Sequence, residues 1–243
     1  MKKVILKAEN LHYSYNKEHE VLKGVSLDIY EGERLAVLGA NGSGKSTFFL
    51  NINGVLKPES GAVYYRDKLI NKSSIKELRK NVGIVFQDAD NQIIASTVRA
   101  EVSFGPMNLG LSREEVTKRV LDSLNYMDIS HLIDRPPHYL SGGEKKRVSI
   151  ADIIAMDSEI IIFDEPTASL DPQNIAIFEE VLDKMSLDKK TMVISTHDLE
   201  FAFRWADRIV VFCAGNIIAD SDPVTVLNND EVLKKANLKK PIL

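Results

Sequence analysis

The segment from Gly39 to Thr47 has the residue types and the spacing of a phosphate-binding loop. It reads Gly-Ala-Asn-Gly-Ser-Gly-Lys-Ser-Thr and fills the pattern G-x-x-x-x-G-K-[ST]. Its glycines remove side chains that would keep main-chain N–H groups away from a polyphosphate. The apolar residues 34–38 before it fit a buried strand, and residues 46–53 can begin a helix whose N-terminus favours anions. A glycine-rich turn that binds nothing would not need this context, so we predict a nucleoside triphosphate site.

Two adjacent carboxylates form the second candidate. Asp164 and Glu165 follow the apolar run 160–163, and Pro166 cannot continue a strand. At the carboxyl end of a parallel strand beside a phosphate loop, an acid is placed to hold Mg²⁺. Successive side chains of a strand diverge, so we assign Mg²⁺ to Asp164 and the attacking water to Glu165, as general base or water-orienting group. The alternative is a solvated acidic strand end.

A third candidate is the run Leu140–Glu144, which contains Ser141, Gly142 and Gly143. A hydroxyl followed by two glycines at a helix start offers N–H groups and the helix dipole to an anion. Alone, the pattern is equally that of an ordinary helix cap. Its meaning therefore depends on the other motifs.

Strands and helices alternate at both ends of the chain, and the middle is helical. Short β segments are predicted at 4–9, around 12–15, at 25–30, at 61–65 and at 68–70. Buried strands are predicted at 82–86, 160–163, 191–196 and 208–213. Alternation with nearly all-apolar strands predicts a mostly parallel sheet covered on both faces. The predicted fold class is α/β: a P-loop core from residues 1–88 and 156–243, with an N-terminal antiparallel β layer and an inserted helical subdomain, residues 89–155.

Composition narrows the class of protein. The chain has 243 residues, of which 44% are hydrophobic and 27% charged, as in ordinary globular proteins. A net charge of −4 argues against a nonspecific nucleic-acid binder. Cys213 is the only cysteine, which excludes an intrachain disulfide and a CxxC metal site. No apolar run approaches the ~20 residues that cross a bilayer, so any link to a membrane is expected through a partner.

Together these motifs resemble those of the ATPase subunits of ABC transporters. The resemblance covers nearly the whole chain, and the motifs stand in the family's order. Gly39–Thr47 is similar to the Walker A loop, Leu140–Glu144 to the ABC signature and Ile160–Glu165 to the Walker B strand. Other matches are Gln87 (the Q-loop glutamine), Ser169–Asp171 (the D-loop), His197 (the switch histidine) and Tyr15 (the aromatic residue that stacks on adenine).

The resemblance implies an ATPase that uses ATP and Mg²⁺. Ser46, Gln87 and Asp164 would hold the metal ion, and the catalytic set would be Glu165, His197, Gln87 and Lys45. The nucleotide would be bound by Tyr15, Gly39, Asn41, Gly42, Ser43, Gly44, Lys45, Ser46, Thr47, Ser141 and Gly143. In the family the signature closes over the nucleotide of a second protomer, which implies two composite sites per dimer. Tyr13 is an alternative to Tyr15, because either ring could instead pack within the β layer.

Residues 85–111 resemble, more narrowly, the ATPases of energy-coupling-factor importers, including the CbiO-type subunit of cobalt uptake systems. Phe104-Gly105-Pro106 and Asn108-Leu109-Gly110 are the most telling part. The resemblance implies uptake of cobalt or a related metal ion, at the cytoplasmic face of the cell membrane, with a transmembrane coupling subunit and a substrate-binding membrane subunit. These residues would form the groove for a coupling helix; the alternative is that they only pack the helical subdomain. Residues 223–243 also resemble this group and end where related chains often continue, which leaves a truncated tail open.

Several alternatives stay open at this point. The ATPase of a vitamin importer would look alike, because other subunits bind the substrate, and the dimer could pair two copies or this chain with a paralogous ATPase. A non-transport ABC ATPase is a further class, although neither a long coiled-coil insertion nor a second fused domain is present. A P-loop phosphotransferase or GTP switch would have no use for Leu140–Glu144, and no Asn-Lys-x-Asp motif occurs.

Overall fold

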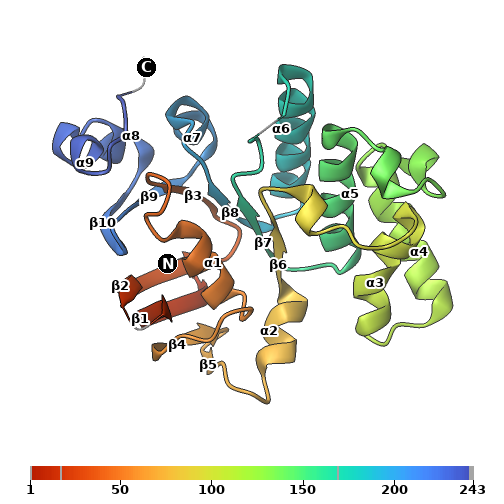
Figure 1. Ribbon diagram of the computed structural model, residues 1–243, viewed down its shortest axis with the longest axis horizontal. Helices are drawn as coiled ribbons and strands as arrows, with labels where there is room; N and C mark the ends of the chain where they lie inside the picture. The colour runs from red at the N-terminus through yellow and green to blue at the C-terminus, as the bar shows by residue number, and fades with distance from the viewer. Residues whose placement is uncertain (1, 17, 169, 241–243) are drawn as a thin grey trace. The chain divides into compact units, whose positions relative to one another are not determined.

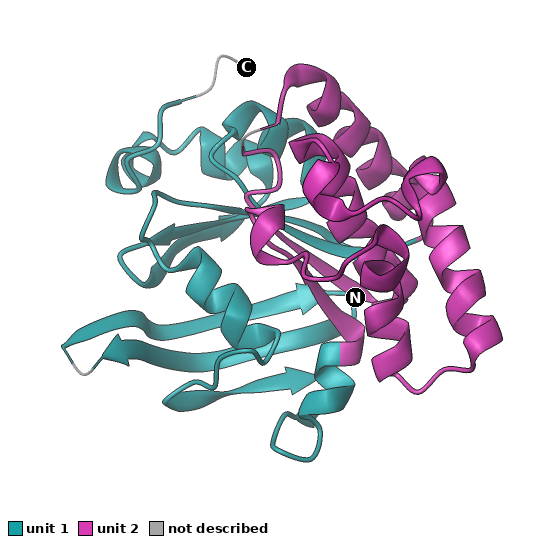
Figure 2. Cartoon of the chain, turned by 45° about the vertical axis from the view of Figure 1, so that its right-hand side comes forward, with its two compact units in different colours: residues 1–79, 189–243 teal, residues 80–188 magenta. Residues whose placement is uncertain are grey.

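The computed structural model describes residues 2–16, 18–168 and 170–240 (Figure 1). The chain divides into two compact units (Figure 2). Unit 1 contains residues 1–79 and 189–243, and unit 2 contains residues 80–188. The predicted helical subdomain, residues 89–155, lies within unit 2, and its limits as a functional subdomain stay a prediction.

The N-terminal part of unit 1 is an antiparallel sheet. It consists of β1 (Val4–Asn16), β2 (His19–Tyr30), β4 (Ser60–Tyr65) and β5 (Lys68–Leu69), in the order β2-β1-β4-β5. The sequence suggested two short strands where β1 is continuous. The reason is a set of register shifts along the β1–β2 pair, including one between Ala8 and Leu11 around Asn10, whose φ is 50°. Such irregularities interrupt the alternation of buried and exposed residues that reveals a strand in sequence.

The second sheet of unit 1 carries the phosphate loop. β3 (Arg34–Leu38) lies between β8 (Thr191–Ser195) and β9 (Arg208–Cys213) and is parallel to both, while β10 (Asn216–Ser221) is antiparallel to β9. These central strands are almost wholly buried and apolar, as parallel strands covered on both faces must be. The helices of the unit are α1 (Lys45–Ile52), α7 (Leu199–Trp205), α8 (Pro223–Leu227) and α9 (Asp230–Lys235), and α2 (Ile75–Asn81) leads into unit 2.

Unit 2 combines a pair of parallel strands with a group of helices. β6 (Val82–Val85) pairs with β7 (Ile160–Asp164). The helices are α3 (Val98–Asn108), α4 (Arg113–Tyr126), α5 (Gly142–Ala155) and α6 (Pro172–Leu187), with short 3₁₀ turns η1 (Ala89–Asn91), η2 (Ser130–Leu132) and η3 (Pro137–Tyr139). Each of the four helices begins at a side chain that accepts a bond from a first-turn N–H: Thr97, Ser112, Ser141 and Asp171.

Helix α5 is the centre of unit 2, since it packs against α3, α4, β6 and η1. Glycines on two of its neighbours allow the close approach. A methyl group on Gly83 of β6 would overlap Ile153, and one on Gly105 of α3 would lie 2.5 Å from Cγ of Met156. The position of α5 against these neighbours is therefore set by close packing, which transmits displacements from one element to the next.

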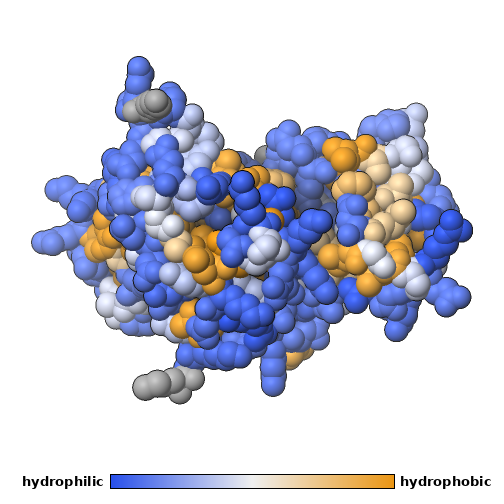
Figure 3. Space-filling model, turned by 90° about the horizontal axis from the view of Figure 1, so that it is seen from below, coloured by the Kyte–Doolittle hydropathy of each residue, from blue (hydrophilic) through white to orange (hydrophobic). Residues whose placement is uncertain are grey.

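Large apolar side chains are exposed on unit 2 just before α3 and in its second half. Ile94, Phe104 and Met107 are 79%, 59% and 64% exposed; we call these three residues the α3 apolar surface. Figure 3 shows hydrophobic side chains at the surface among hydrophilic ones. Within the described residues, none of the helices has both the length and the apolar character of a membrane span.

Candidate functional site

The predicted phosphate loop leaves β3 and runs directly into α1. Gly39, Gly42 and Gly44 have φ values of 148°, 76° and 109°, which favour glycine. At Gly39 a Cβ would also overlap the carbonyl oxygen of Phe212 and lie 2.8 Å from Oγ of Ser43. The path of the loop therefore depends on glycine at this position.

The polar groups of this loop fit a bound phosphate. Nζ of Lys45 points back into the loop and donates to the carbonyl oxygens of Gly39 (2.7 Å) and Ala40 (3.3 Å). Oγ of Ser43 is buried without a hydrogen-bond partner in the described structure. Gly44 leaves the first turn of α1 without a side-chain cap, and no acidic residue lies in that turn. A buried ammonium, an unsatisfied hydroxyl and an uncapped helix N-terminus together favour an anion.

The two candidate tyrosines differ in exposure. Tyr15 is 62% exposed, and its hydroxyl lies 3.2 Å from Oγ1 of Thr47 at the start of α1. Tyr13 is half-buried and packs its ring edge-to-face against Tyr15, with ring centroids 5.1 Å apart. An adenine needs an accessible ring face for stacking. The geometry therefore favours Tyr15 and gives Tyr13 a supporting position.

His197 follows the strand next to the phosphate loop. Val37 of β3 is in register with Ser195 of β8, and the N–H of Thr196 donates to the carbonyl of Val37 (3.3 Å). His197 thus lies where both strands end, is exposed, and lines a cavity of about 370 Å³ with residues 198–200 and 237–239. Unit 1 therefore brings the loop, Tyr15 and His197 to one region.

In unit 2, Gln87, Asp164 and Glu165 stand at the ends of the two parallel strands. Val85 of β6 is in register with Phe163 of β7, so the chain leaves both strands at the same edge. Asp164 is buried and Gln87 is exposed. Glu165 has a φ of 44°. A left-handed conformation at a non-glycine residue is strained, by on the order of 1–3 kcal/mol, and such strain concentrates at functional sites.

The donors available to a metal ion are oxygens. Among the residues that the structure describes, no cluster of three or more His, Cys, Asp or Glu side chains could hold a metal ion by itself. The predicted ligands are Ser46 in unit 1 and Gln87 and Asp164 in unit 2. They carry a hydroxyl, an amide and a carboxylate, which are donor types that a hard cation prefers. The donor chemistry of these side chains is therefore consistent with the predicted Mg²⁺.

The predicted signature begins helix α5 with a complete capping box. Oε2 of Glu144 accepts bonds from the N–H (2.8 Å) and the hydroxyl (3.0 Å) of Ser141, and the N–H of Glu144 donates back to Oγ of Ser141 (3.3 Å). The pKa of Glu144 is lowered mainly by the hydrogen bond that its carboxylate accepts from the backbone N–H of Ser141. Ser141 is exposed, whereas Gly143 is buried, and a Cβ on it would overlap the side chain of Asn174 on α6. In the predicted D-loop, Ser169 lies outside the described residues, and Asp171 caps α6.

The sequence analysis missed Lys146, one turn into α5. Only 4% of this residue is exposed, and Nζ donates to the carbonyl oxygens of Phe86 (2.8 Å) and Gln87 (2.7 Å). Burial lowers the pKa of Lys146 to about 8, against the opposing charges of Asp88 and Asp164. One signal was available: Lys146 precedes Ile150 by four positions, which places a lysine on the apolar face of the helix.

Two further residues connect α5 to the segment 86–92, which we call the Q-loop segment. Oε1 of Gln92 accepts a bond from the N–H of Phe86 (3.2 Å), and its Nε2 donates to the carbonyl of Ser149 (3.2 Å). Nζ of Lys145 pairs with Oδ1 of Asp90 (2.5 Å). Lys145, Lys146 and Gln92 therefore connect α5 to the Q-loop segment through hydrogen bonds and an ion pair.

Asp152 of α5 lies in an environment that disfavours its charge. Its Oδ1 is buried and has no hydrogen-bond partner in the part of the chain described. Burial, followed by the charge of Glu101, raises the pKa of Asp152 to about 7, and a bond from Gln92 acts in the opposite direction. Glu101 itself accepts bonds from the N–H groups of Ile94 (2.9 Å) and Ala95 (2.7 Å).

We expect Asp152→Asn to stabilise the protein more at pH 8 than at pH 5. The folded state binds the proton of Asp152 up to about pH 7, whereas the unfolded chain releases it near 3.8. Stability therefore falls as pH rises between these values and stays lower above them. Removing the ionisation should add on the order of 1–3 kcal/mol to the free energy of unfolding at pH 8.

Denaturant unfolding at pH 5 and pH 8 measures this difference. Asp122→Asn, an exposed aspartate of α4, is the control and should show no such pH dependence. An equal effect of Asp152→Asn at both pH values would contradict the prediction.

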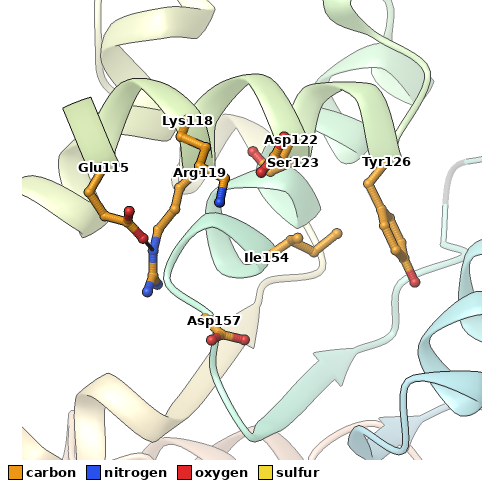
Figure 4. Close-up of a pocket in the computed structure, with 8 residues that line it drawn as sticks. All are labelled: Glu115, Lys118, Arg119, Asp122, Ser123, Tyr126, Ile154 and Asp157. Atoms are coloured by element: carbon orange, nitrogen blue, oxygen red, sulfur yellow. Dashed lines mark hydrogen bonds and ion pairs between the residues drawn. The ribbon is translucent and has the colours of Figure 1, made fainter. Parts of the chain in front are cut away.

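A cavity of about 300 Å³ on α4 and the end of α5 is separate from these residues (Figure 4). In Figure 4 the side chain of Arg119 points toward Glu115, and Nε lies 3.0 Å from Oε1. Nη1 of Arg119 also donates to the carbonyl of Ala155 (3.3 Å). None of the predicted site residues lines this cavity, so it is not part of the candidate site.

Comparison with known proteins identifies the family. Residues 22–168 match the model of the ABC transporter family. The energy-coupling factor transporter ATP-binding protein EcfA of Methanocaldococcus jannaschii is 44% identical over 239 residues, which cover 98% of this chain and 86% of that protein. The energy-coupling factor transporter ATP-binding protein EcfA2 of Methanospirillum hungatei is 43% identical over 241 residues. That match covers 98% of this chain and 61% of the relative.

Solved structures agree with this match. The structure of cbiO1 from Clostridium perfringens, described as part of the ABC transporter complex cbiONQ, has a TM-score of 0.84 and 41% identity, and covers 97% of this chain and 95% of that one. A second similar structure is the dimeric post-hydrolysis state of an ATP-binding cassette bound to ADP and Pi. Its TM-score is 0.80 at 31% identity, and the match covers 90% of this chain and 99% of that one. The predicted α/β fold is thereby confirmed as that of ABC ATPases. This chain is therefore a member of the ABC transporter family, an ABC ATPase among its energy-coupling-factor ATP-binding proteins.

Proposed function

We propose that this chain is the ATP-hydrolysing subunit of an energy-coupling-factor importer, and that it powers the uptake of cobalt or a related metal ion through membrane partners. The observation that carries the proposal is the placement of the predicted site residues. The loop 39–47 and His197 in unit 1, and Gln87, Asp164 and Glu165 in unit 2, lie at the carboxyl ends of parallel strands, where α/β proteins bind their ligands. Homology to energy-coupling-factor proteins supplies the transport context.

Unit 1 would bind ATP. The loop 39–47 would wrap the phosphates, with Lys45 between the β- and γ-phosphates and Tyr15 stacked on adenine. His197 would donate a hydrogen bond to the γ-phosphate from the end of β8. Phosphoryl transfer to water needs mainly positioning and neutralisation of charge, which these residues can supply.

Unit 2 would direct the attacking water. Glu165 would orient this water and accept its proton. The left-handed backbone at Glu165 would set the direction of its side chain. Ser46, Asp164 and Gln87 would be the residues that hold Mg²⁺, whose chemistry there would be neutralisation of phosphate charge. Gln87 would also report the state of the site to the membrane partner.

We further propose a dimer with two composite sites. Ser141 and Gly143 would close over the nucleotide of the second protomer, which is either another copy of this chain or a paralogue. The exposed N-terminus of α5 and the dimeric form of a similar cassette support this arrangement. Separation of the two halves of each site on different chains would make hydrolysis depend on dimer closure.

The α3 apolar surface would receive the transmembrane coupling subunit. Its three side chains are exposed close to the Q-loop segment in the sequence, on the part of the chain that most resembles energy-coupling-factor ATPases. Exposed apolar groups of this kind mark interaction sites. The chain would then work at the cytoplasmic face of the cell membrane, together with a substrate-binding membrane subunit and without nucleic acid.

Copurification tests this proposal. The tagged chain, expressed with the membrane proteins encoded beside it, should copurify with a polytopic membrane protein and support ATP-dependent cobalt uptake into vesicles. Phe104→Asp with Met107→Asp should reduce copurification about tenfold or more, because charge opposes burial of this surface. Leu187→Asp, at an exposed leucine of α6, is the control and should have no effect. Vitamin uptake instead of cobalt uptake would favour the vitamin importer, and recovery with DNA or ribosomes would favour a non-transport ATPase.

A further inference from the structure

We propose that Lys146 is a positioning residue for ATP hydrolysis, which holds the backbone of Gln87 in place and ties the Q-loop segment to the signature helix α5. The inference deepens the proposed function and rests on it, because it takes Gln87 as a ligand of Mg²⁺ and a member of the catalytic set. Lys146 itself is not expected to touch the nucleotide.

The contacts of Lys146 are specific to two consecutive peptide groups. Its Nζ lies 2.8 Å from the carbonyl oxygen of Phe86 and 2.7 Å from that of Gln87. Both oxygens belong to the turn in which the chain leaves β6, beyond the residues of β6 that are in register with β7. Two short charge-assisted bonds at this turn restrict the backbone of Gln87, and hence the directions that its exposed side chain can take.

The surroundings show why a cation lies here. Burial disfavours the charge of Lys146, and the carboxylates of Asp88 and Asp164 favour it. The ammonium group therefore lies within the electrostatic reach of the predicted Mg²⁺ ligand Asp164 as well as in contact with the backbone of Gln87. A single buried cation therefore contacts the segment after β6 through hydrogen bonds and acts on Asp164 at the end of β7 through its charge.

The position of Lys146 on α5 gives this contact a second consequence. Ser141 caps the helix, and Lys146 lies in its next turn. A helix moves nearly as a rigid element over this distance, so a displacement of the signature is passed on to Gln87 through Nζ. The bond from Gln92 to Ser149 and the Lys145–Asp90 ion pair make the connection stiffer. Closure of the dimer over Ser141 would thereby adjust Gln87.

Steady-state ATPase kinetics of Lys146→Met in the full chain test the inference. Methionine keeps much of the side-chain length but cannot donate to the two carbonyls. We expect kcat to fall about 10- to 100-fold, as is typical when a group that orients a metal ligand is lost. The Mg²⁺ concentration for half-maximal rate should rise, whereas ATP affinity should change by less than about threefold, because the loop 39–47 is unaltered. Lys118→Met, at an exposed lysine of α4, is the charge-matched control and should resemble the wild type.

A double-mutant cycle separates a positioning role from a structural one. If Lys146 acts through Gln87, Lys146→Met adds little to the loss caused by Gln87→Ala. Lys146→Gln keeps N–H donors and should recover part of the rate; it also replaces Lys146→Met in the same tests if circular dichroism shows that the methionine variant does not fold. An unchanged kcat in Lys146→Met, or losses that multiply in the double variant, would overturn the inference. If Gln87→Ala itself leaves hydrolysis unchanged, the assignment of Gln87 in the proposed function fails instead.

Discussion

Replacing Glu165 with glutamine is expected to stop ATP turnover and leave ATP binding intact. Glutamine has nearly the same size and can occupy the same position after Asp164, but it cannot accept the proton of the attacking water. General bases contribute typically about 10²–10⁴-fold to a rate, so turnover should fall by at least the lower figure. Because binding depends on the loop 39–47, ATP should remain bound and hold the dimer closed.

Two measurements check this result. Phosphate release gives the loss of turnover, and size-exclusion chromatography with and without ATP shows whether Glu165→Gln accumulates as a closed dimer. Glu114→Gln, at an exposed glutamate in the first turn of α4, serves as the control and should behave like the wild type. Turnover by Glu165→Gln within about threefold of the wild type would refute the assignment of the base.

The second large effect concerns a mixture of two inactive variants. Lys45→Ala removes the charge inside the phosphate loop, and Ser141→Arg blocks the predicted signature contact with a large side chain. Either variant alone should lose both composite sites of its dimer, by about 10²–10³-fold in rate for one preorganised group. In a mixed dimer, one site combines the intact loop of one chain with the intact signature of the other. Mixing should therefore restore one site.

Differently tagged chains, purified as the mixed dimer, allow this test. The minimum expected result is binding of a γ-phosphate-containing nucleotide at one site per mixed dimer, with an ATPase rate above that of either parent. If each nucleotide were bound by one chain alone, the mixture would show only the average of the two parents. That result would exclude a site shared between protomers.

Much of the fold could be predicted because buried parallel strands are recognisable in the sequence as short apolar runs. β3, β7, β8 and β9 are buried apolar runs, and the structure places each within a residue of its predicted limits. The short helices α8 and α9 were not predicted, since neither has enough turns for a periodic pattern. The family and its energy-coupling-factor type were predicted correctly from the motifs, whereas cobalt as the substrate stays a proposal.

In the candidate site, only the residues that belong to local sequence motifs could be predicted. Gly39 and Glu165 lie in segments whose chemistry can be read from adjacent residues. Lys146 is different, because its partners Phe86 and Gln87 are distant in the sequence and are brought to it by the packing of α5. The preference for Tyr15 over Tyr13 likewise required the exposure of each ring, which the sequence of an irregular strand pair does not reveal.

The carboxylate of Glu144 already occupies the N–H and the hydroxyl of Ser141. In the proposed dimer, an incoming γ-phosphate would have to displace this resident acid and approach its negative charge. Closure is then an exchange of one anion for another, and the net gain is smaller than for empty donors. Once the γ-phosphate has been cleaved, Glu144 would take back both donors, and this competition would favour separation of the protomers.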